Sequence, residues 1–253
     1  MDINSILVRV RPAPLAVFLK SLLRVRRIEM ETQYGRFWAD PASSFGSRLT
    51  SSQGYEPGMS AAAATLAAES KTFVDIGANE GYFSVLVALR MGDGGRVVAV
   101  EPQLSLAGVL QRNLEINGLS DRVEHYSYAI SDYVGNAQLY LTPTVNAGSS
   151  ALTRTTSYRV PTQPVSTVTL LELLSRARIA SVDLLKMDIE GSEYEAILGS
   201  KEVFENKRVK TLLLEMHPRQ IAAKGKEPRD IGTFLTHCGY AEKTEFGITI
   251  WKA

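Results

Sequence analysis

Phe73-Val-Asp-Ile-Gly-Ala-Asn-Glu-Gly-Tyr82 is the most informative stretch of this sequence. The run from Thr72 to Ile76 is apolar and β-branched, which predicts a buried strand, and the residues from Tyr82 to Met91 predict a helix. Gly77 and Gly81 lie between the two elements. Glycine allows a sharp turn and lets a ligand approach without a Cβ in the way. Because ligands of open α/β sheets bind at the carboxyl ends of strands, this turn is expected to line the main site.

Farther along the chain, short apolar runs alternate with longer amphipathic stretches. Strands are expected at 96–100, 123–129, 182–187 and 209–215, helices at 105–117, 169–176, 231–237 and from 193, and a closing hairpin at 242–252. A helix is also expected at 61–69, whereas 31–60 is expected to contain little strand. Strands that alternate with helices predict an α/β fold with a mostly parallel sheet and helices on both faces.

Composition limits the possible classes of protein. A chain of 253 residues that is 45% hydrophobic suits one large domain, here predicted at 61–253, behind an N-terminal region at 1–60. The formal net charge of +1 gives no overall attraction for nucleic acid. A single cysteine, Cys238, cannot form an internal disulfide. No run reaches the roughly 20 apolar residues of a membrane span, and no signal peptide is recognisable, so a cytoplasmic location is expected.

The first 30 residues differ from the rest of the chain. They contain six basic residues, Arg9, Arg11, Lys20, Arg24, Arg26 and Arg27, against the two acidic residues Asp2 and Glu29. Apolar side chains recur at helical spacing at Leu15, Phe18, Leu19, Leu22 and Leu23. A basic amphipathic helix can lie on a membrane surface. It can equally pack on its own domain or on a second subunit, which is the usual case for a surface helix.

Acidic residues around the glycine turn indicate the charge of the ligand. Dinucleotide sites usually carry Gly-x-Gly-x-x-Gly, but this turn has only Gly77 and Gly81, with Asp75 before them and Glu80 between them. Two carboxylates would repel a pyrophosphate and would suit a ligand with a cationic amine. Glu101 ends the next predicted strand, where an acid can accept hydrogen bonds from ribose hydroxyls.

These motifs resemble those of the FkbM family of class I methyltransferases, which depend on S-adenosylmethionine (SAM). The matching stretches are residues 73–81, 100–102, 113–117, 129–132 and 185–193, with Gln53-Gly-Tyr-Glu-Pro57 ahead of the first strand. The run Lys186-Met-Asp-Ile-Glu-Gly-Ser-Glu193 is the most specific of them, and the resemblance extends over about residues 45–253. It implies a Rossmann-like sheet of seven strands whose last strand is antiparallel.

The resemblance also implies SAM as the cofactor and indicates which residues would bind it. Asp75, Gly77, Asn79 and Gly81 would shape the site of the methionine part, Glu101 would hold the ribose, and the segment from Tyr128 to Ser131 would lie beside the adenine. The predicted cofactor-binding set is Glu56, Asp75, Gly77, Ala78, Asn79, Gly81, Tyr82, Glu101, Pro102, Ala129 and Asp188. Glu56 enters this set through the hypothesis that the region around it folds over the site as a lid.

The candidate catalytic residues follow the fourth and fifth predicted strands. Alternation puts Asp188 and Glu190 on one side of the chain, and likewise Glu215 and His217. His217 can act as general base because its ordinary pKa is near neutrality, and Asp188 is the alternative. These carboxylates could also hold Mg²⁺ or Ca²⁺, but no metal is predicted. Glu193 is interpreted as an acid that interacts with the dipole of the helix it begins.

The predicted function is methyl transfer to a hydroxyl of a sugar, a glycoconjugate or another small natural product. Residues 146–150 form a loop that could bind this acceptor. The alternatives are a small-molecule N-methyltransferase and a non-catalytic SAM-binding scaffold. Enzymes that methylate adenine or cytosine nitrogens are disfavoured, because their Pro-rich aromatic motif is replaced here by residues 188–191. A cytosine-C5 enzyme needs a nucleophilic cysteine, and Cys238 lies far from the site in sequence.

Overall fold

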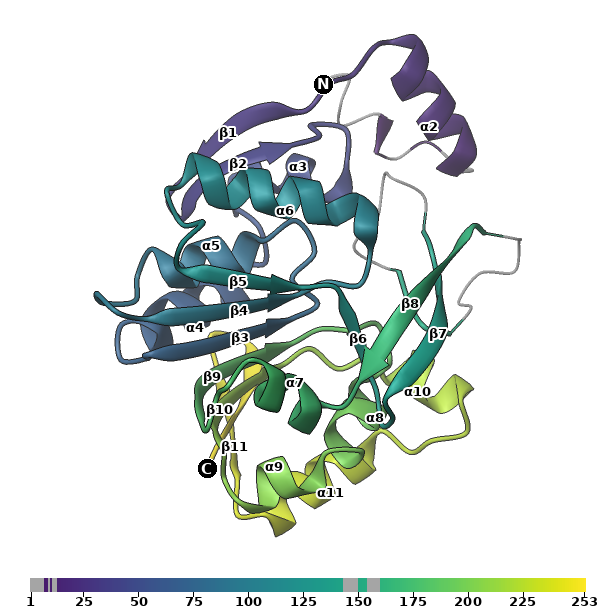
Figure 1. The fold of residues 1–253 in the computed structure, drawn as a ribbon. Helices are drawn as coiled ribbons and strands as arrows, with labels where there is room; N and C mark the ends of the chain where they lie inside the picture. Colours follow the sequence, from purple (N-terminus) through teal and green to yellow (C-terminus); the bar gives the residue numbers. More distant parts are fainter. Residues whose placement is uncertain (1–6, 9, 11–12, 143–149, 154–159) are drawn as a thin grey trace.

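The computed structural model describes residues 7–8, 10, 13–142, 150–153 and 160–253. At its centre is a seven-stranded sheet with the strand order β11 (Ala241–Glu245), β12 (Ile248–Lys252), β10 (Val209–Leu214), β9 (Val182–Met187), β3 (Thr72–Ile76), β4 (Arg96–Val100) and β5 (Val123–Tyr126). The strands from β10 to β5 are parallel, and β12 pairs antiparallel with β10 (Figure 1). The predicted sheet, with its antiparallel last strand, is confirmed.

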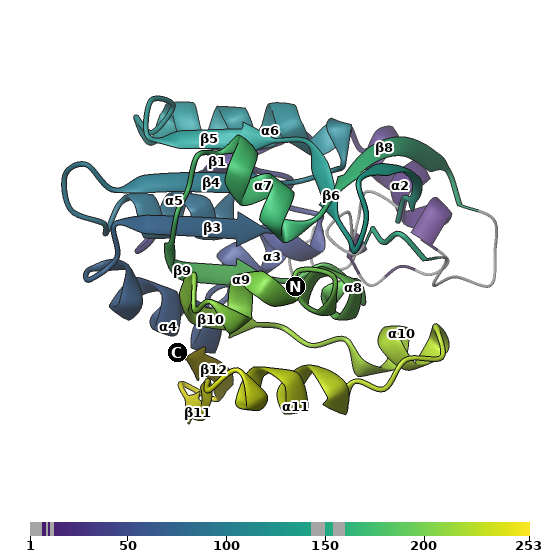
Figure 2. The same ribbon diagram turned by 60° about the horizontal axis from the view of Figure 1, so that its bottom comes forward.

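Helices cover both faces of this sheet, as the alternating pattern predicted (Figure 2). One face packs against α4 (Pro57–Ala67), α5 (Tyr82–Ala88) and α6 (Leu104–Ile116). The other packs against α7 (Leu170–Arg176), α8 (Glu193–Leu198), α9 (Lys201–Glu205) and α11 (Arg229–His237). Phe73 of β3 points into the first core and Val74 and Ile76 into the second, so the central strand is apolar on both sides.

Part of the third predicted strand belongs to a different sheet. The expected strand at 123–129 is interrupted at Ser127. Its first part, β5, is the edge of the large sheet, whereas β6 (Tyr128–Ile130) pairs with β8 (Thr162–Val168), which in turn pairs with β7 (Gly135–Tyr140). Apolar residues are common to both parts, so the composition of 123–129 gave no sign of the break. The small sheet extends from the carboxyl edge of the large one (Figure 1).

The expectation of little strand at 31–60 is wrong. An antiparallel hairpin of β1 (Ile28–Thr32) and β2 (Gly35–Ala39) precedes α3 (Ser44–Leu49). Two asparagines of α6 hold β2: Asn113 Oδ1 accepts from the Trp38 N–H at 2.6 Å, and Asn117 Oδ1 accepts from the Arg36 N–H at 3.0 Å. The hairpin is therefore held in place by hydrogen bonds to residues some 80 positions away in the sequence. Local propensity cannot reveal such long-range contacts.

Smaller differences concern helix ends. α4 begins at Pro57, four residues before the predicted start at Ala61, and α5 ends at Ala88 rather than at Met91. Pro57 suits the first turn of a helix because its missing N–H would have no partner there. No helix among the described residues is long and apolar enough to cross a membrane.

Candidate active site

The turn between β3 and α5 brings the backbone very close to the next strand. Gly77 and Gly81 both have left-handed conformations, with φ of 82° and 85°. A Cβ added to Gly77 would lie 1.9 Å from the carbonyl oxygen of Asp188. The N–H groups of Gly77 and Ala78 both donate to the Val100 carbonyl at 3.0 Å. Glycine at 77 is thus required both by φ and by the close approach of the segment after β9.

Glu101 follows β4 and faces this turn. Its carboxylate accepts hydrogen bonds from the N–H of Asn79 at 2.9 Å and from the N–H of Gln103 at 2.8 Å. Burial raises the pKa of Glu101 to about 7, although these two bonds act in the opposite direction. A carboxylate has about four acceptor positions, so Glu101 can accept further hydrogen bonds from the hydroxyls of a ligand.

Two buried oxygen atoms beside the turn have no hydrogen-bond partner among the described residues, Asp75 Oδ1 and Asn79 Oδ1. Asp75 is fully buried, and its other oxygen accepts from Ser84 Oγ at 2.7 Å. Burial raises the pKa of Asp75, while the nearby Lys186 ammonium lowers it. Because buried polar groups are nearly always hydrogen-bonded, these two oxygens favour a polar ligand at the turn.

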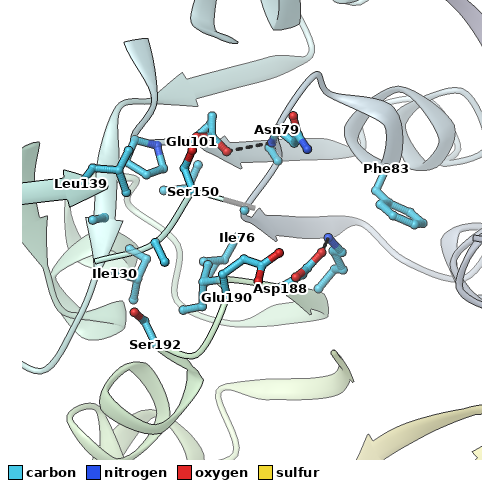
Figure 3. Close-up of a pocket in the computed structure, with 18 of the residues that line it drawn as sticks. Ile76, Asn79, Phe83, Glu101, Ile130, Leu139, Ser150, Asp188, Glu190 and Ser192 are labelled. Atoms are coloured by element: carbon cyan, nitrogen blue, oxygen red, sulfur yellow. Dashed lines mark hydrogen bonds and ion pairs between the residues drawn. The ribbon is translucent and has the colours of Figure 1, made fainter. Parts of the chain in front are cut away.

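The turn opens onto a pocket at the carboxyl ends of β3, β4 and β9. Its apolar end is formed by Ile76, Val100, Pro102, Tyr128, Ala129, Ile130, Leu139, Ala151 and Leu152, and its polar end by Lys186, Asp188, Glu190 and Ser192. Glu101 and Asn79 lie on one wall, across from Asp188 and Glu190 (Figure 3). The pocket suits a ligand with one flat apolar end and one charged end.

Glu80 does not supply the free negative charge that was expected of it. It is 3% exposed, and its two oxygens accept from Arg27 at 2.6 and 3.2 Å. Arg27 lies just before β1, 53 residues upstream, so the sequence gave no sign that the two would pair. The negative charge on the pocket wall therefore comes from Glu101, Asp188 and Glu190.

Lys186 lies beneath the polar end of the pocket and is 2% exposed. Its ammonium group is 3.2 Å from Asp188 Oδ2 and 4.8 Å from the ring centre of Phe83. Burial would lower the pKa of Lys186, but the carboxylates of Asp188 and Asp75 outweigh that effect and raise it. The lysine is therefore a fixed cation that holds two carboxylates of the site in place.

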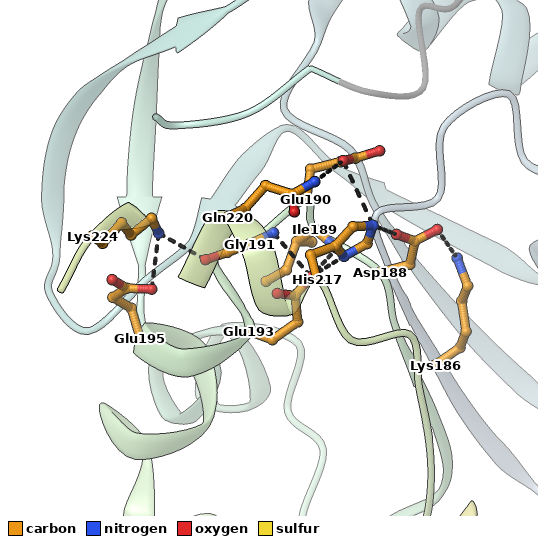
Figure 4. Close-up of polar contacts among 10 residues, drawn as sticks. All are labelled: Lys186, Asp188, Ile189, Glu190, Gly191, Glu193, Glu195, His217, Gln220 and Lys224. Carbon is orange, nitrogen blue, oxygen red and sulfur yellow. Dashed lines mark hydrogen bonds and ion pairs between the residues drawn. The ribbon is translucent and has the colours of Figure 1, made fainter. Parts of the chain in front are cut away.

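Sequence reasoning missed the role of Glu193. Its side chain has no exposed surface, and its Oε1 accepts from the N–H groups of Ile189 and Gly191, both at 3.1 Å. The same oxygen is 2.8 Å from His217 Nδ1 (Figure 4). A buried acid at the first turn of α8 thus binds both the loop after β9 and the imidazole after β10. The sequence signal was only an acid at a helix start, which usually interacts with the dipole alone.

With Nδ1 held by Glu193, His217 directs Nε2 toward the pocket wall. Nε2 is 3.6 Å from Glu190 Oε2 and 3.8 Å from Asp188 Oδ1. Both separations are those of ion pairs rather than of hydrogen bonds, so the imidazole faces two carboxylates on this side. His217 itself lies behind Asp188 and Glu190 rather than on the wall of the pocket.

Protons can be exchanged in this cluster near neutral pH. Burial would lower the pKa of His217, but its hydrogen bond to Glu193 and the charges of Glu193, Glu190 and Asp188 raise it to about 9. Burial, followed by the charges of Asp188 and Glu56, raises the pKa of Glu215 to about 7. The histidine is thus protonated at neutral pH, and the glutamate is close to its midpoint.

A second pocket lies beside the first. It is lined by Glu56 and Glu215 and by apolar residues of α4, α11, the β11–β12 hairpin and the segment after β10, among them Met59, Met216, Ile231, Phe246 and Ile248. In the sheet, β9 separates β10 and β12, which border this pocket, from β3 and β4, which border the first. The two pockets therefore flank the charged cluster.

A divalent ion is the other species that this cluster could hold. Asp188, Glu215 and His217 each offer one ligand atom, and these atoms lie within 4.8 Å of one another. Lys186 already neutralises Asp188, and Glu193 with the carboxylates around it keeps His217 protonated. A bound ion would compete with Lys186 for Asp188 and with a proton for His217.

The predicted cofactor residues are not all on the wall of the first pocket. Gly77, Ala78, Asn79, Tyr82, Glu101, Pro102, Ala129 and Asp188 line it. Asp75 lies beneath the turn, Gly81 packs against Leu110, and Glu56 lines the second pocket with Glu215. Of the loop at 146–150, Ser150 lines the first pocket, whereas 146–149 lie outside the described residues.

Comparison with known proteins agrees with this arrangement. Residues 75–241 match the Methyltransferase FkbM domain. No curated protein matches the chain significantly. Similar solved structures include an O-methyltransferase from Bacillus cereus in complex with SAH (TM-score 0.43, 15% identity, covering 80% of this chain and 84% of that one). A second is the O-methyltransferase TomG of tomaymycin synthesis from Streptomyces achromogenes, in complex with SAM (TM-score 0.46, 12% identity, covering 95% and 96%).

A third similar structure is an FkbM methyltransferase from Methylobacillus flagellatus KT (TM-score 0.45, 15% identity), with 73% of this chain and 44% of that one covered. The domain match is more specific, because it extends over well more than half of the chain and includes the glycine turn, Glu101 and the cluster after β9. The protein belongs to the FkbM family of methyltransferases.

Proposed function

We propose that this protein transfers the methyl group of SAM to a hydroxyl oxygen of a small acceptor. The observation that carries the proposal is the pocket beside the glycine turn, which has an apolar end, a free acceptor face on Glu101 and a carboxylate-rich end. SAM, when bound, supplies a methyl group on a sulfonium, which needs no further activation. The protein therefore has to bind the donor, align the acceptor and remove a proton.

The donor would be held by residues of two adjacent strand ends. Glu101 would accept hydrogen bonds from the ribose hydroxyls, and the segment from Tyr128 to Ile130 would border the adenine. Asn79 Oδ1, on the wall of the pocket, would gain the partner that it lacks. Asp188 and Glu190 would balance the positive charges of the ligand. This last contribution supports SAM over a dinucleotide, whose pyrophosphate those carboxylates would repel.

The acceptor hydroxyl would lie among His217 Nε2, Asp188 and Glu190. Nε2 lies 3.6 Å from Glu190 Oε2 and 3.8 Å from Asp188 Oδ1, so an acceptor hydroxyl that displaced one of these carboxylates would come within hydrogen-bond reach of Nε2. In its neutral form, His217 would take the hydroxyl proton, and Glu193 would stabilise the imidazolium through Nδ1. General base catalysis of this kind contributes about 10²–10⁴-fold to a rate.

The class of acceptor is inferred from the second pocket. Its lining combines the carboxylates of Glu56 and Glu215 with apolar side chains such as Met59, Ile231 and Trp251. Such a surface suits a sugar, a glycoconjugate or another natural product that has both hydroxyl groups and an apolar face. We infer a cytoplasmic location, because the donor SAM is a cytoplasmic metabolite.

The experiment that tests the proposal is calorimetric titration of the full chain with SAM, with its demethylated product and with NAD⁺. SAM and its product should bind, and NAD⁺ should not. Transfer of radiolabelled methyl groups to a panel of glycosides, phenols and amines then identifies the reacting atom. Binding of NAD⁺ alone would refute the proposal. Transfer only to amines would favour an N-methyltransferase, and SAM binding without transfer to any acceptor would favour a scaffold.

A further inference from the structure

The N-terminal helix α2 (Ala13–Leu22) turns its apolar face away from the protein. Leu15, Phe18 and Leu22, which share one face, are 44%, 62% and 67% exposed. The opposite face is the buried one: Ala16 has no exposed surface, and Lys20 is 7% exposed. Surface helices ordinarily bury their apolar face, so this helix has the reverse orientation.

Two ion pairs fix this orientation. Lys20 points inward and pairs with Asp40, which follows β2. A few residues after the helix, Arg27 pairs with Glu80 of the glycine turn and lies over the ring of Trp38. Both cations lie on the protein side of the segment, so α2 cannot turn its leucines inward without breaking a buried or half-buried pair.

The exposed apolar side chains are concentrated in this one segment. The ten large hydrophobic residues that are exposed among the described residues include Leu15, Phe18, Leu22, Leu23 and Ile28. Contiguous apolar patches on a protein surface usually mark the binding site of a protein or a membrane. Arg24 and Arg26 are exposed between Leu23 and Ile28, so the patch carries positive charge at one end.

We propose that the face of α2 formed by Leu15, Phe18, Leu22 and Leu23 docks the protein onto an anionic lipid surface. The leucines and Phe18 would enter the boundary between headgroups and acyl chains, and Arg24 and Arg26 would contact lipid phosphates. The observations favour a membrane over a second copy of this chain. A dimer held by this face would rest on about five side chains per partner, far fewer than the roughly 20–30 residues per partner of a stable interface.

Sedimentation of the full chain with large unilamellar vesicles tests this proposal. The vesicles contain phosphatidylcholine, either alone or with about one third phosphatidylglycerol. The wild-type protein should sediment with the anionic vesicles and much less with the neutral ones. Phe18→Ser/Leu22→Ser should abolish binding, and Arg24→Gln/Arg26→Gln should weaken it about fivefold for each charge removed and make it less sensitive to salt.

Leu89→Ser/Val134→Ser is the matched control, because it removes two exposed apolar side chains elsewhere and should bind vesicles like the wild type. Thermal unfolding and SAM affinity should be unchanged in all three variants, so a failure of membrane binding is distinguishable from a failure of the methyltransferase proposal. Equal sedimentation of Phe18→Ser/Leu22→Ser would overturn the proposal. It would also be overturned if no vesicle bound while light scattering showed a dimer that this variant dissociates.

Discussion

The two ends of the main pocket are built in different ways. At the turn after β3, the interactions are backbone hydrogen bonds within one strand–helix–strand unit, with Gly77, Asn79 and Glu101 as the key positions. At the ends of β9 and β10, side chains hold one another: Lys186 pairs with Asp188, and Glu193 holds His217. Substitutions that change the size of a side chain should therefore have their main effect at the first end. Substitutions that change a charge should have their main effect at the second end.

The largest effect is expected at the charged end. His217→Ala removes the proposed base, so methyl transfer should fall by about 10²–10⁴-fold while SAM affinity stays within a few fold. Single-turnover transfer and calorimetry measure the two quantities separately. His237→Ala is the control, since this exposed histidine lies on α11 away from the site. Normal turnover by His217→Ala would show that the base is elsewhere, and Asp188→Asn would then be the next variant to measure.

The next effect concerns the shape of the turn. Gly77→Ala adds a Cβ that would lie 1.9 Å from a backbone oxygen, at a φ of 82°. We expect a loss of more than about 3 kcal/mol of unfolding free energy, or loss of SAM binding in whatever protein folds. Thermal and urea unfolding measure the first quantity. Gly92→Ala serves as control, because nothing lies within 4 Å of its added Cβ. Equal stability of both variants would contradict the close packing of the turn against Asp188.

A smaller effect is expected from Glu101→Gln. The amide keeps the shape of the side chain but loses its charge and part of its capacity to accept hydrogen bonds, so SAM should bind about 1–3 kcal/mol more weakly. Calorimetry measures this change, and the exposed Glu124→Gln on β5 is the matched control. Because the pKa of Glu101 is raised to about 7, wild-type affinity should fall as the pH drops through 7. Affinity that is independent of pH in the wild type would argue against a hydrogen bond from ribose to this carboxylate.

The smallest effect is a shift of the pH profile. His217 must be neutral to accept a proton, so kcat/KM should rise with pH toward about 9, the pKa set by Glu193, Glu190 and Asp188. Glu193→Gln removes one of these charges and keeps a hydrogen-bond acceptor for Nδ1, so the midpoint should move to lower pH. The pKa of His217 can be measured independently by NMR of the imidazole. An unchanged midpoint in Glu193→Gln would mean that the buried acid only supports the loop after β9.

The sheet and the glycine turn beside the pocket could be predicted from the sequence for a physical reason. A strand buried on both faces carries apolar side chains on both sides, as Phe73, Val74 and Ile76 do on β3, and a turn that folds back against its neighbour requires glycine. Both are local requirements, and they are met within one unit between residues 72 and 101. Boundaries such as the break between β5 and β6 were missed, because local composition does not reveal the strand with which each part pairs.

Only the tertiary structure decided which acidic side chains are bound by another side chain of the protein. Glu80 was expected to face the ligand, but Arg27 binds it from a hairpin that local propensity did not predict. Glu193 was expected to act on a helix dipole, but it holds His217 across two strand ends. The spacing of Leu15 and Phe18 specified a helix with an apolar face, and the pairing of Lys20 with Asp40 turned that face outward. Periodicity and turn chemistry are encoded over a few residues, whereas an ion pair depends on where the fold brings two distant side chains.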